Sequence, residues 1–287
     1  MSLTKRELET RVARIHPMSE TAQSILRVLE DPKRSVSQLI RIVECDAPLT
    51  LRVLRLANSA AFALASEVES VAHAISYLGE RAVVAAALSQ GASEIFETPL
   101  DGYASEGTGL WSSSLRTAVA SRLVAQQADI GVSPTLAYTG GLLRDIGKLV
   151  VSKELEGSTA EAVAQVDAGE ARDFCAAERD LVGFDHTEVG SMIAGRFRLS
   201  PALAEVIRHH HAPSEASAEH AGLVCAVHVG DALSMMLGGE PSADNMAYRL
   251  ESQAIDRLKL TGQGMQSLAA ATLDEFSRTQ EAFGSRS

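Results

Sequence analysis

Apolar residues recur at helical spacing along nearly the whole chain, whereas the alternation of apolar and polar residues that is typical of strands is scarce. Ser19, Ser35 and Ser70 each precede an apolar stripe, where the N-cap of a helix is expected. Aromatic residues make up only 4% of the chain, and no segment carries the signals of a β-hairpin. The pattern therefore predicts an all-α fold.

The apolar stripes, with the proline and glycine residues between them, set the limits of the predicted helices. These helices span 20–30, 36–45, 49–58, 71–78, 80–96, 110–128, 135–151, 186–197, 201–211, 217–237 and 263–283. Residues 151–185 are acidic and less apolar, which indicates exposed helices and their connections. We expect helices 49–58 and 80–96 to carry the contact between the two halves of the chain.

The helical pattern lapses over residues 98–109, where one proline and three glycines indicate a loop. This loop is the expected boundary between two subdomains. We predict an N-terminal helical subdomain over 1–105, a second helical subdomain over 106–240 and a C-terminal helical extension over 241–287.

Composition narrows the class of protein. Hydrophobic residues make up 46% of the 287 residues, so a sizeable core is expected, and the formal net charge is −11. An acidic surface argues against nucleic acid as a partner. The three cysteines form no CxxC pair, and no segment has the pattern of a signal peptide or a membrane span. We expect a cytoplasmic protein with no membrane partner.

The stretch Thr135–Val151 places three charged residues, Arg144, Asp145 and Lys148, among apolar neighbours at helical spacing. We interpret it as one inward-facing helix, in which Asp145 and Lys148 share a face. A carboxylate in such a position is costly to bury unless a positive group pairs with it. Asp145 is therefore the first candidate for a functional site.

Further polar residues lie on apolar stripes. His186 and Asp231 each continue such a stripe, and the phase of the 201–211 helix favours His210 over His209 and His211 as the inward-facing histidine. Imidazole and carboxylate ligands of this kind suit a transition metal. The alternative is that each histidine is a hydrogen-bonded core residue.

Other candidates for chemistry are weaker. Cys175 and Cys225 each stand alone among apolar neighbours, where a cysteine is usually an inert core residue. The pair Gly140-Gly141 lies inside a predicted helix, which indicates close helix packing rather than phosphate binding.

Eight fragments carry a resemblance to a known family. In chain order they read HPMSETAQSILRVLEDP, CDAPLTLRVLRLANSAAF, VAHAISYLGERAV, LWSSSLRTAVASRLVA, GGLLRDIGKLVV, FDHTEVGSMIAGRF, EVIRHHHAP and AVHVGDAL. Together they resemble an HDOD domain, a degenerate relative of the HD-domain and HD-GYP metal-dependent phosphohydrolases. The resemblance implies an all-α fold in which an N-terminal helical bundle packs on a degenerate HD-like subdomain.

Two residues depart from the pattern of an active HD enzyme. Such an enzyme would have histidine where this chain has Ser113, and a His-Asp pair where it has Arg144-Asp145. A neutral hydroxyl is a poor ligand, and a guanidinium has no lone pair to donate. We therefore expect no catalytic residues, no bound metal and no cofactor.

The remaining members of the HD pattern are present. Asp145, His186, His210 and Asp231 match ligand positions, and they stay as weak candidates for a metal site. Lys148 matches a position that assists phosphate chemistry in related cyclic-dinucleotide hydrolases. With Ser113 and Arg144, these residues form the vestigial pocket.

The resemblance implies a bacterial signal-transduction and regulatory module that is not an enzyme and that acts through contact with a protein partner. The alternatives are a residual metal-dependent phosphohydrolase and a sensor that binds a nucleotide second messenger in the old pocket. Arg144 has two alternatives of its own. Its guanidinium neutralises the carboxylates in place of a metal, or its side chain points to solvent.

Overall fold

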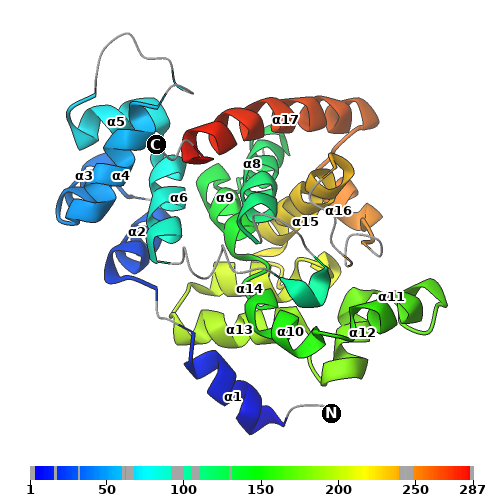
Figure 1. Ribbon diagram of the computed structural model, residues 1–287. Coiled ribbons are helices and arrows are strands. Elements are labelled where there is room, and N and C mark those ends of the chain that lie inside the picture. Colours follow the sequence, from blue (N-terminus) through cyan, green and yellow to red (C-terminus); the bar gives the residue numbers. More distant parts are fainter. Residues whose placement is uncertain are drawn as a thin grey trace.

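The computed structural model describes residues 4–15, 18–31, 33–59, 62, 68–91, 100–104, 110–128, 131–238, 243 and 248–284. Helices and turns account for nearly all of these residues, and no strand occurs among them (Figure 1). The predicted all-α fold is confirmed.

Six α-helices are seen in the described residues of the N-terminal part. They are α1 (Lys5–Ala13), α2 (Glu20–Glu30), α3 (Val36–Glu44), α4 (Ala47–Ala57), α5 (Val71–Leu78) and α6 (Glu80–Gly91). The predicted N-caps are confirmed. The side chains of Ser19 and Ser70 accept hydrogen bonds from backbone N–H groups of the first turn, and the Ser35 N–H donates to Gln38 Oε1 at 2.8 Å.

The second part of the chain, up to residue 238, holds eight α-helices and two short 3-10 helices in its described residues. They are η2 (Asp101–Tyr103), α8 (Leu110–Ala128), α9 (Pro134–Leu143), α10 (Lys148–Leu155), α11 (Thr159–Asp167), α12 (Phe174–Val182), α13 (His186–Arg196), α14 (Pro201–His209), η3 (Pro213–Glu215) and α15 (Ala221–Met236). The C-terminal part holds α16 (Ser252–Arg257) and α17 (Gly262–Gly284).

Helix α8 is the centre of this second part, because α9, α15 and α17 all pack against it (Figure 1). Glycines let two of these helices come close. A Cβ on Gly141 of α9 would lie 2.7 Å from Ala118 Cα, and one on Gly230 of α15 would lie 2.5 Å from the Ser121 nitrogen. The expected role of Gly140-Gly141 in close packing is confirmed.

The N-terminal helices contact the second part mainly through α6 and α2, which lie against α9, and through α1, which lies against α13. The expected contribution of helix 80–96 holds for α6, whose described residues end at Gly91. Helix 49–58 was also expected to contact the second part of the chain. The corresponding helix α4 does not make one of the main contacts, because it packs on α3, α5 and α6 instead. Both predicted domain boundaries, at 105/106 and at 240/241, lie outside the described residues and stay predictions.

The prediction of one continuous helix over 135–151 is wrong. The helix ends at Leu143, and a new one begins at Lys148. Between them, Ile146 N–H donates to the Leu143 carbonyl and Lys148 N–H to the Asp145 carbonyl, which are the tighter i to i−3 bonds of a turn. Gly147 allows this turn to touch α13, since a Cβ there would lie 1.9 Å from the His186 carbonyl oxygen. This turn presents Asp145 to the site.

Two further helix boundaries differ from the sequence analysis. Helix α14 ends at His209 instead of continuing to residue 211, and α15 begins at Ala221 instead of residue 217. The 151–185 region also differs, because it is not simply exposed: α12 buries Phe174 and Glu178. Glu178 thus adds a buried carboxylate to Asp145 and Asp231.

Among the described residues, no single helix combines the length and the apolar character needed to cross a membrane. Helices α5 and α6, bent by 106° at their junction, pass that test of length and composition only when they are taken together.

The α8–α9 contact generates a first prediction. We expect Gly141→Ala to lower the free energy of unfolding by about 1–3 kcal/mol, because the new methyl group meets backbone atoms of α8 that cannot move aside. The measurement is urea unfolding followed by circular dichroism.

The matched control for that substitution is Gly195→Ala. Gly195 also lies in a helix, α13, but a Cβ there meets nothing within 4 Å. This variant should gain about 0.5–1 kcal/mol from its higher helix propensity. Equal effects of the two substitutions would show that close α8–α9 packing is not what Gly141 provides.

Candidate functional site

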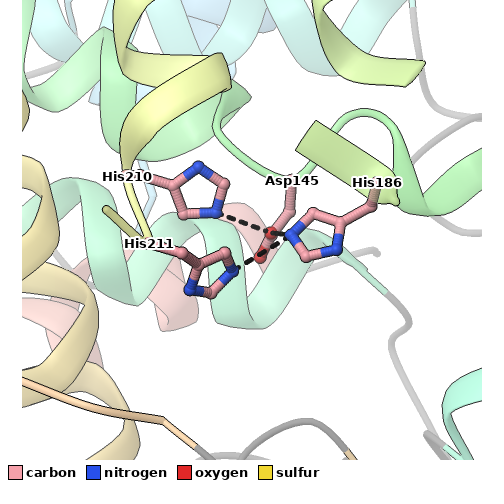
Figure 2. Close-up of side chains that lie close together, drawn as sticks. All are labelled: Asp145, His186, His210 and His211. Atoms are coloured by element: carbon pink, nitrogen blue, oxygen red, sulfur yellow. Dashed lines mark hydrogen bonds and ion pairs between the residues drawn. The ribbon is translucent and has the colours of Figure 1, made fainter. Parts of the chain in front are cut away.

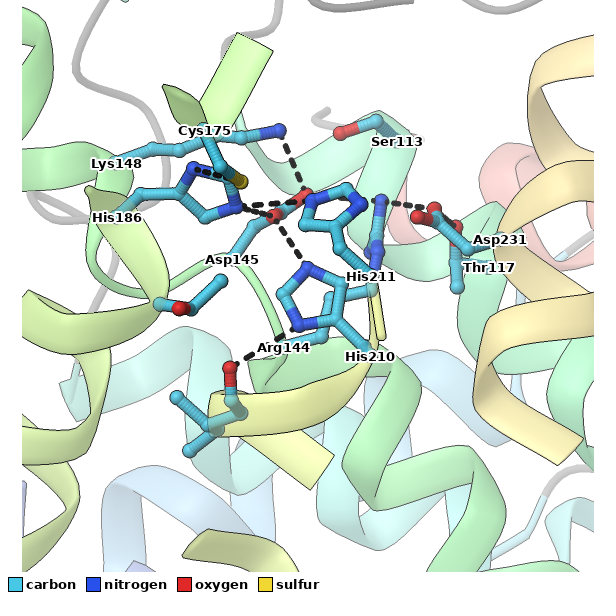
Figure 3. A network of polar contacts seen from close by, with 12 residues as sticks. Ser113, Thr117, Arg144, Asp145, Lys148, Cys175, His186, His210, His211 and Asp231 are labelled. Atoms are coloured by element: carbon cyan, nitrogen blue, oxygen red, sulfur yellow. Dashed lines mark hydrogen bonds and ion pairs between the residues drawn. The ribbon is translucent and has the colours of Figure 1, made fainter. Parts of the chain in front are cut away.

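The four predicted ligand residues come together in one buried cluster in the second part of the chain (Figure 3). Asp145 lies in the α9–α10 turn, and His186 is the first residue of α13. His210 is the C-cap of α14, and Asp231 lies within α15. Each residue is at most 1% exposed. The sequence pattern thus locates the site, and its members come from separate elements.

Arg144 lies between the two carboxylates. Its Nη2 is 3.0 Å from Asp145 Oδ2 and 2.7 Å from Asp231 Oδ1 (Figure 3). Its Nη1 donates to the Gly141 carbonyl at 2.9 Å, and the residue is 2% exposed. The guanidinium therefore neutralises both carboxylates inside the protein, and the solvent-facing alternative is excluded.

Lys148 adds a second cation on the same side of Asp145. Its Nζ is 3.0 Å from Asp145 Oδ2 and 5.3 Å from the centre of the Tyr103 ring. Burial by itself would raise the pKa of the Asp145 carboxyl, but Arg144 and Lys148 outweigh burial and hold its pKa well below the usual range. Asp145 is thus a carboxylate whose Oδ2 is fully engaged by cations.

Helix α8 supplies the remaining polar groups near Asp231. The Thr117 hydroxyl donates to Asp231 Oδ1 at 3.1 Å. Ser113 lies one turn earlier on α8 at the edge of the cluster (Figure 3), and its hydroxyl donates to the Leu110 carbonyl at 3.2 Å. A hydroxyl bonded in this way and a guanidinium stand at the two positions where the resemblance implies imidazole ligands in an active HD enzyme. A guanidinium has no lone pair to donate, and Arg144 lies between the two carboxylates, so these residues do not fit a metal at that position.

A group of histidines forms the other side of the cluster (Figure 2). His186 Nε2 is 3.0 Å from His211 Nε2 and 3.5 Å from Asp145 Oδ1. His210 Nε2 is 3.4 Å from the same oxygen. Asp145 therefore faces cations with one oxygen and imidazoles with the other.

Glu178 of α12 fixes the orientation of His186. Both of its carboxylate oxygens lie 2.9 Å from His186 Nδ1, and Oε2 also accepts the His186 backbone N–H at 2.7 Å. The Tyr103 hydroxyl donates to Oε1 at 2.6 Å. Burial would lower the pKa of His186, but the Glu178 carboxylate outweighs burial and raises that pKa well above its usual value.

The two buried cysteines, Cys175 and Cys225, lie in surroundings that disfavour reactivity, as the sequence predicts. Burial raises the pKa of the Cys175 thiol to about 12, although its sulfur lies 4.0 Å from His186 Nδ1. Burial also raises the pKa of Cys225. A raised pKa disfavours the thiolate, which is the nucleophilic form.

The sequence analysis missed His211, Glu178 and Tyr103. The sequence analysis excluded His211 because the predicted helix 201–211 would turn its side chain outward. Helix α14 ends at His209, so helical periodicity does not determine where the His211 side chain points. Glu178 lies in an acidic region, eight residues before His186. The sequence pattern does not distinguish this buried glutamate from the solvated acidic residues around it.

Comparison with known proteins places the chain among relatives of this architecture. The family model described as the HDOD domain matches residues 15–213. An uncharacterised protein of Treponema pallidum is 24% identical over 249 residues, which are 85% of this chain and 47% of that protein. Ribonuclease Y of Thermus thermophilus is 30% identical over 143 residues, 50% of this chain and 20% of the enzyme. The chain therefore spans less than half the length of these relatives.

Solved structures share the fold. An HDOD domain protein of Geobacter sulfurreducens gives a TM-score of 0.70 at 23% identity, with 98% of this chain and 99% of that chain covered. A Marinobacter aquaeolei VT8 protein, provisionally described as a signal transduction protein, gives 0.75 at 20% identity, with 98% and 65% covered. A Shewanella amazonensis SB2B protein, provisionally described as a phosphohydrolase, gives 0.65 at 21% identity, with 96% of each chain covered.

The position of Arg144 generates a second prediction. We expect Arg144→Met to lower the free energy of unfolding by about 3–5 kcal/mol, because it leaves buried Asp231 without its cation and Asp145 with Lys148 alone. Chemical denaturation at neutral pH measures this loss.

The matched control is Arg172→Met, since Arg172 pairs with Asp173 but its own side chain is largely exposed. Its loss should cost about 0–1 kcal/mol. If the two variants unfold at the same denaturant concentration, the guanidinium between Asp145 and Asp231 does not stabilise the fold.

Proposed function

The chain belongs to the HDOD domain family, and we propose that it is a cytoplasmic regulatory module of signal transduction that binds a protein partner and does not catalyse hydrolysis. The observation that carries this proposal is the buried contact of Arg144 with Asp145 and Asp231. Metal-dependent hydrolysis needs an ion with an open position for water or substrate. A fixed cation between the two carboxylates gives neither a Lewis acid nor an activated water.

The geometry around Asp145 supports the same conclusion. Its Oδ2 contacts both Arg144 and Lys148, so Lys148 is engaged inside the network. In a phosphate-binding pocket, a lysine would instead point its ammonium group toward the ligand. These contacts favour a regulatory module over a residual phosphohydrolase and over a nucleotide sensor.

Net charge and the descriptions of similar structures both favour a protein as the binding partner. A regulatory module without catalytic activity acts by binding another molecule. A net charge of −11 disfavours nucleic acid and leaves a protein as the favoured partner. The provisional description of the Marinobacter structure as a signal transduction protein agrees with this role, while the provisional phosphohydrolase from Shewanella represents the alternative that an assay must exclude.

The third prediction is that the protein does not hydrolyse phosphate esters. We expect no release of product from cyclic dinucleotides, nucleoside phosphates or single-stranded RNA, with Mg²⁺, Mn²⁺ or Zn²⁺ present, beyond a buffer control. The RNA is included because Ribonuclease Y is among the relatives. An active HD phosphohydrolase assayed in parallel shows that each condition supports turnover.

Two variants separate true activity from contaminants. Asp145→Asn removes the carboxylate at the centre of the cluster, and Asp274→Asn alters an exposed carboxylate that pairs with Arg278. Turnover that the first variant loses and the second keeps, with both folded by circular dichroism, would refute the non-catalytic proposal.

The contact with a protein partner is tested by reconstitution. Proteins that copurify with the chain from its own cells are identified, expressed alone and mixed with the pure chain. We expect a defined complex with a regulatory or signalling protein in analytical ultracentrifugation. If no candidate reassembles from pure components, the protein-contact proposal fails.

A further inference from the structure

Helix α17 lies across α8, and its second half reaches α6 of the N-terminal part (Figure 1). Its buried face contains Leu268 and Phe276. The Arg116 guanidinium of α8 lies 5.2 Å from the centre of the Phe276 ring, and the ring centres of Phe283 and Trp111 are 5.7 Å apart. An apolar stripe and these ring contacts thus hold α17 on α8, and the opposite face of the helix is exposed.

One carboxylate of α17 pairs with arginines from both parts of the chain. Glu275 Oε1 is 3.1 Å from Arg81 Nη1 of α6, and Glu275 Oε2 pairs with Arg122 Nη2 of α8. Arg122 is 6% exposed, and its Nη1 donates to Gln126 Oε1 at 2.5 Å. Glu275 therefore bridges the N-terminal part and the second part.

The two arginines depend on this carboxylate. Burial lowers the pKa of Arg122, the Glu275 carboxylate acts in the opposite direction, and the nearby charge of Arg81 lowers that pKa as well. An arginine stays protonated in proteins, so a counter-charge must offset the cost of its burial. The attraction between α6 and α8 at this point thus comes from a group that belongs to neither helix.

Removal of the carboxylate reverses the sign of this interaction. With Glu275 between them, Arg81 and Arg122 are each attracted to one anion. Without it, two guanidiniums of like charge face each other where one of them is buried, and salt screens such charges less than exposed ones. The repulsion acts against the packing of α6 on α9, which is the other main contact of α6 with the second part.

We propose that α17 is a latch that sets how the two parts of the chain face each other. When α17 is seated on α8, Glu275 holds Arg81 and Arg122 together, and the two parts are closed. When α17 is displaced, the two arginines repel and the α6 side of the N-terminal part moves away from α8. The inference concerns conformation rather than hydrolysis or the identity of a partner, so it stands apart from the proposed function.

Release of α17 has a cost and a gain that define two states. The cost is exposure of the apolar stripe that contains Leu268 and Phe276. The gain is hydration of Arg122 on the side that Glu275 contacts. A helix that packs mainly on one neighbour and exposes its other face is an element that opens at low free energy.

The competing interpretation is that Glu275 only stabilises the fold. Its loss would then lower the melting temperature and leave the two parts in the same relative position. The two interpretations differ in the distance between the parts, and in whether the loss of a second charge restores that distance.

The experiment measures this distance in the full chain. One spin label is placed on Cys45, the exposed cysteine of the N-terminal part, and one on an introduced cysteine, Ala218→Cys, at an exposed position of the second part. The other two cysteines are buried. Double electron–electron resonance should give one narrow distance distribution for the parent and a second, longer population for Glu275→Gln. The matched control Asp274→Asn, which alters the adjacent exposed carboxylate of α17, should match the parent.

A second substitution makes the test specific for repulsion. Arg81→Gln in the Glu275→Gln background removes one of the two like charges and should restore the narrow distribution. Added salt should also reduce the longer population of Glu275→Gln, because salt screens the repulsion. Phe283→Ala loosens α17 from Trp111 without a change of charge and should create the same longer population, so it decides the question if Glu275→Gln does not fold.

Two outcomes would overturn the latch. The first is a distance distribution in Glu275→Gln, or in Phe283→Ala where the former does not fold, that equals the distribution of the parent. The second is a longer population in Glu275→Gln that Arg81→Gln does not remove. Either result would leave Glu275 as a stabilising contact and nothing more.

Discussion

The second part of this structure depends on one buried contact, in which the guanidinium of Arg144 neutralises the carboxylates of Asp145 and Asp231. Without it, Asp231 would be buried with no compensating cation, and Asp145 would keep only Lys148. The contact joins the α9–α10 turn to α15 in the interior. Arginine suits this place because it stays charged when buried and presents several donors in one plane. The contact is thus a cross-link between helices.

Such short polar contacts require helices that approach one another closely. Gly141 and Gly230 let α9 and α15 lie against the backbone of α8, and Gly147 lets the turn touch α13. Each of these glycines faces backbone atoms at less than normal contact distance for a Cβ, so its lack of a side chain is a packing requirement. The glycines therefore support the ion pairs, because they set the short distances between helices that the ion pairs need.

The sequence predicts those features of the fold and the site that depend on residues close together in the chain. The N-caps at Ser19, Ser35 and Ser70 follow from a few neighbouring residues, and they are confirmed. The break at Arg144–Gly147 and the part played by His211 depend on which other helix packs there, information that helical periodicity does not hold. The residues that match a family motif were therefore found, and those recruited by tertiary contact were missed.

The two oxygens of Asp145 divide the cluster into halves with different needs. Oδ2 is satisfied by Arg144 and Lys148, which belong to the chain and are always present. Oδ1 faces the Nε2 atoms of His186 and His210 at 3.5 and 3.4 Å. The first half ties the α9–α10 turn to α15 through the chain's own charges, because Arg144 contacts both Asp145 and Asp231. The second half ties the same turn to the start of α13 and the end of α14 through imidazoles. One carboxylate thus joins elements that are far apart in the sequence, and a change at any of them reaches the others through Asp145.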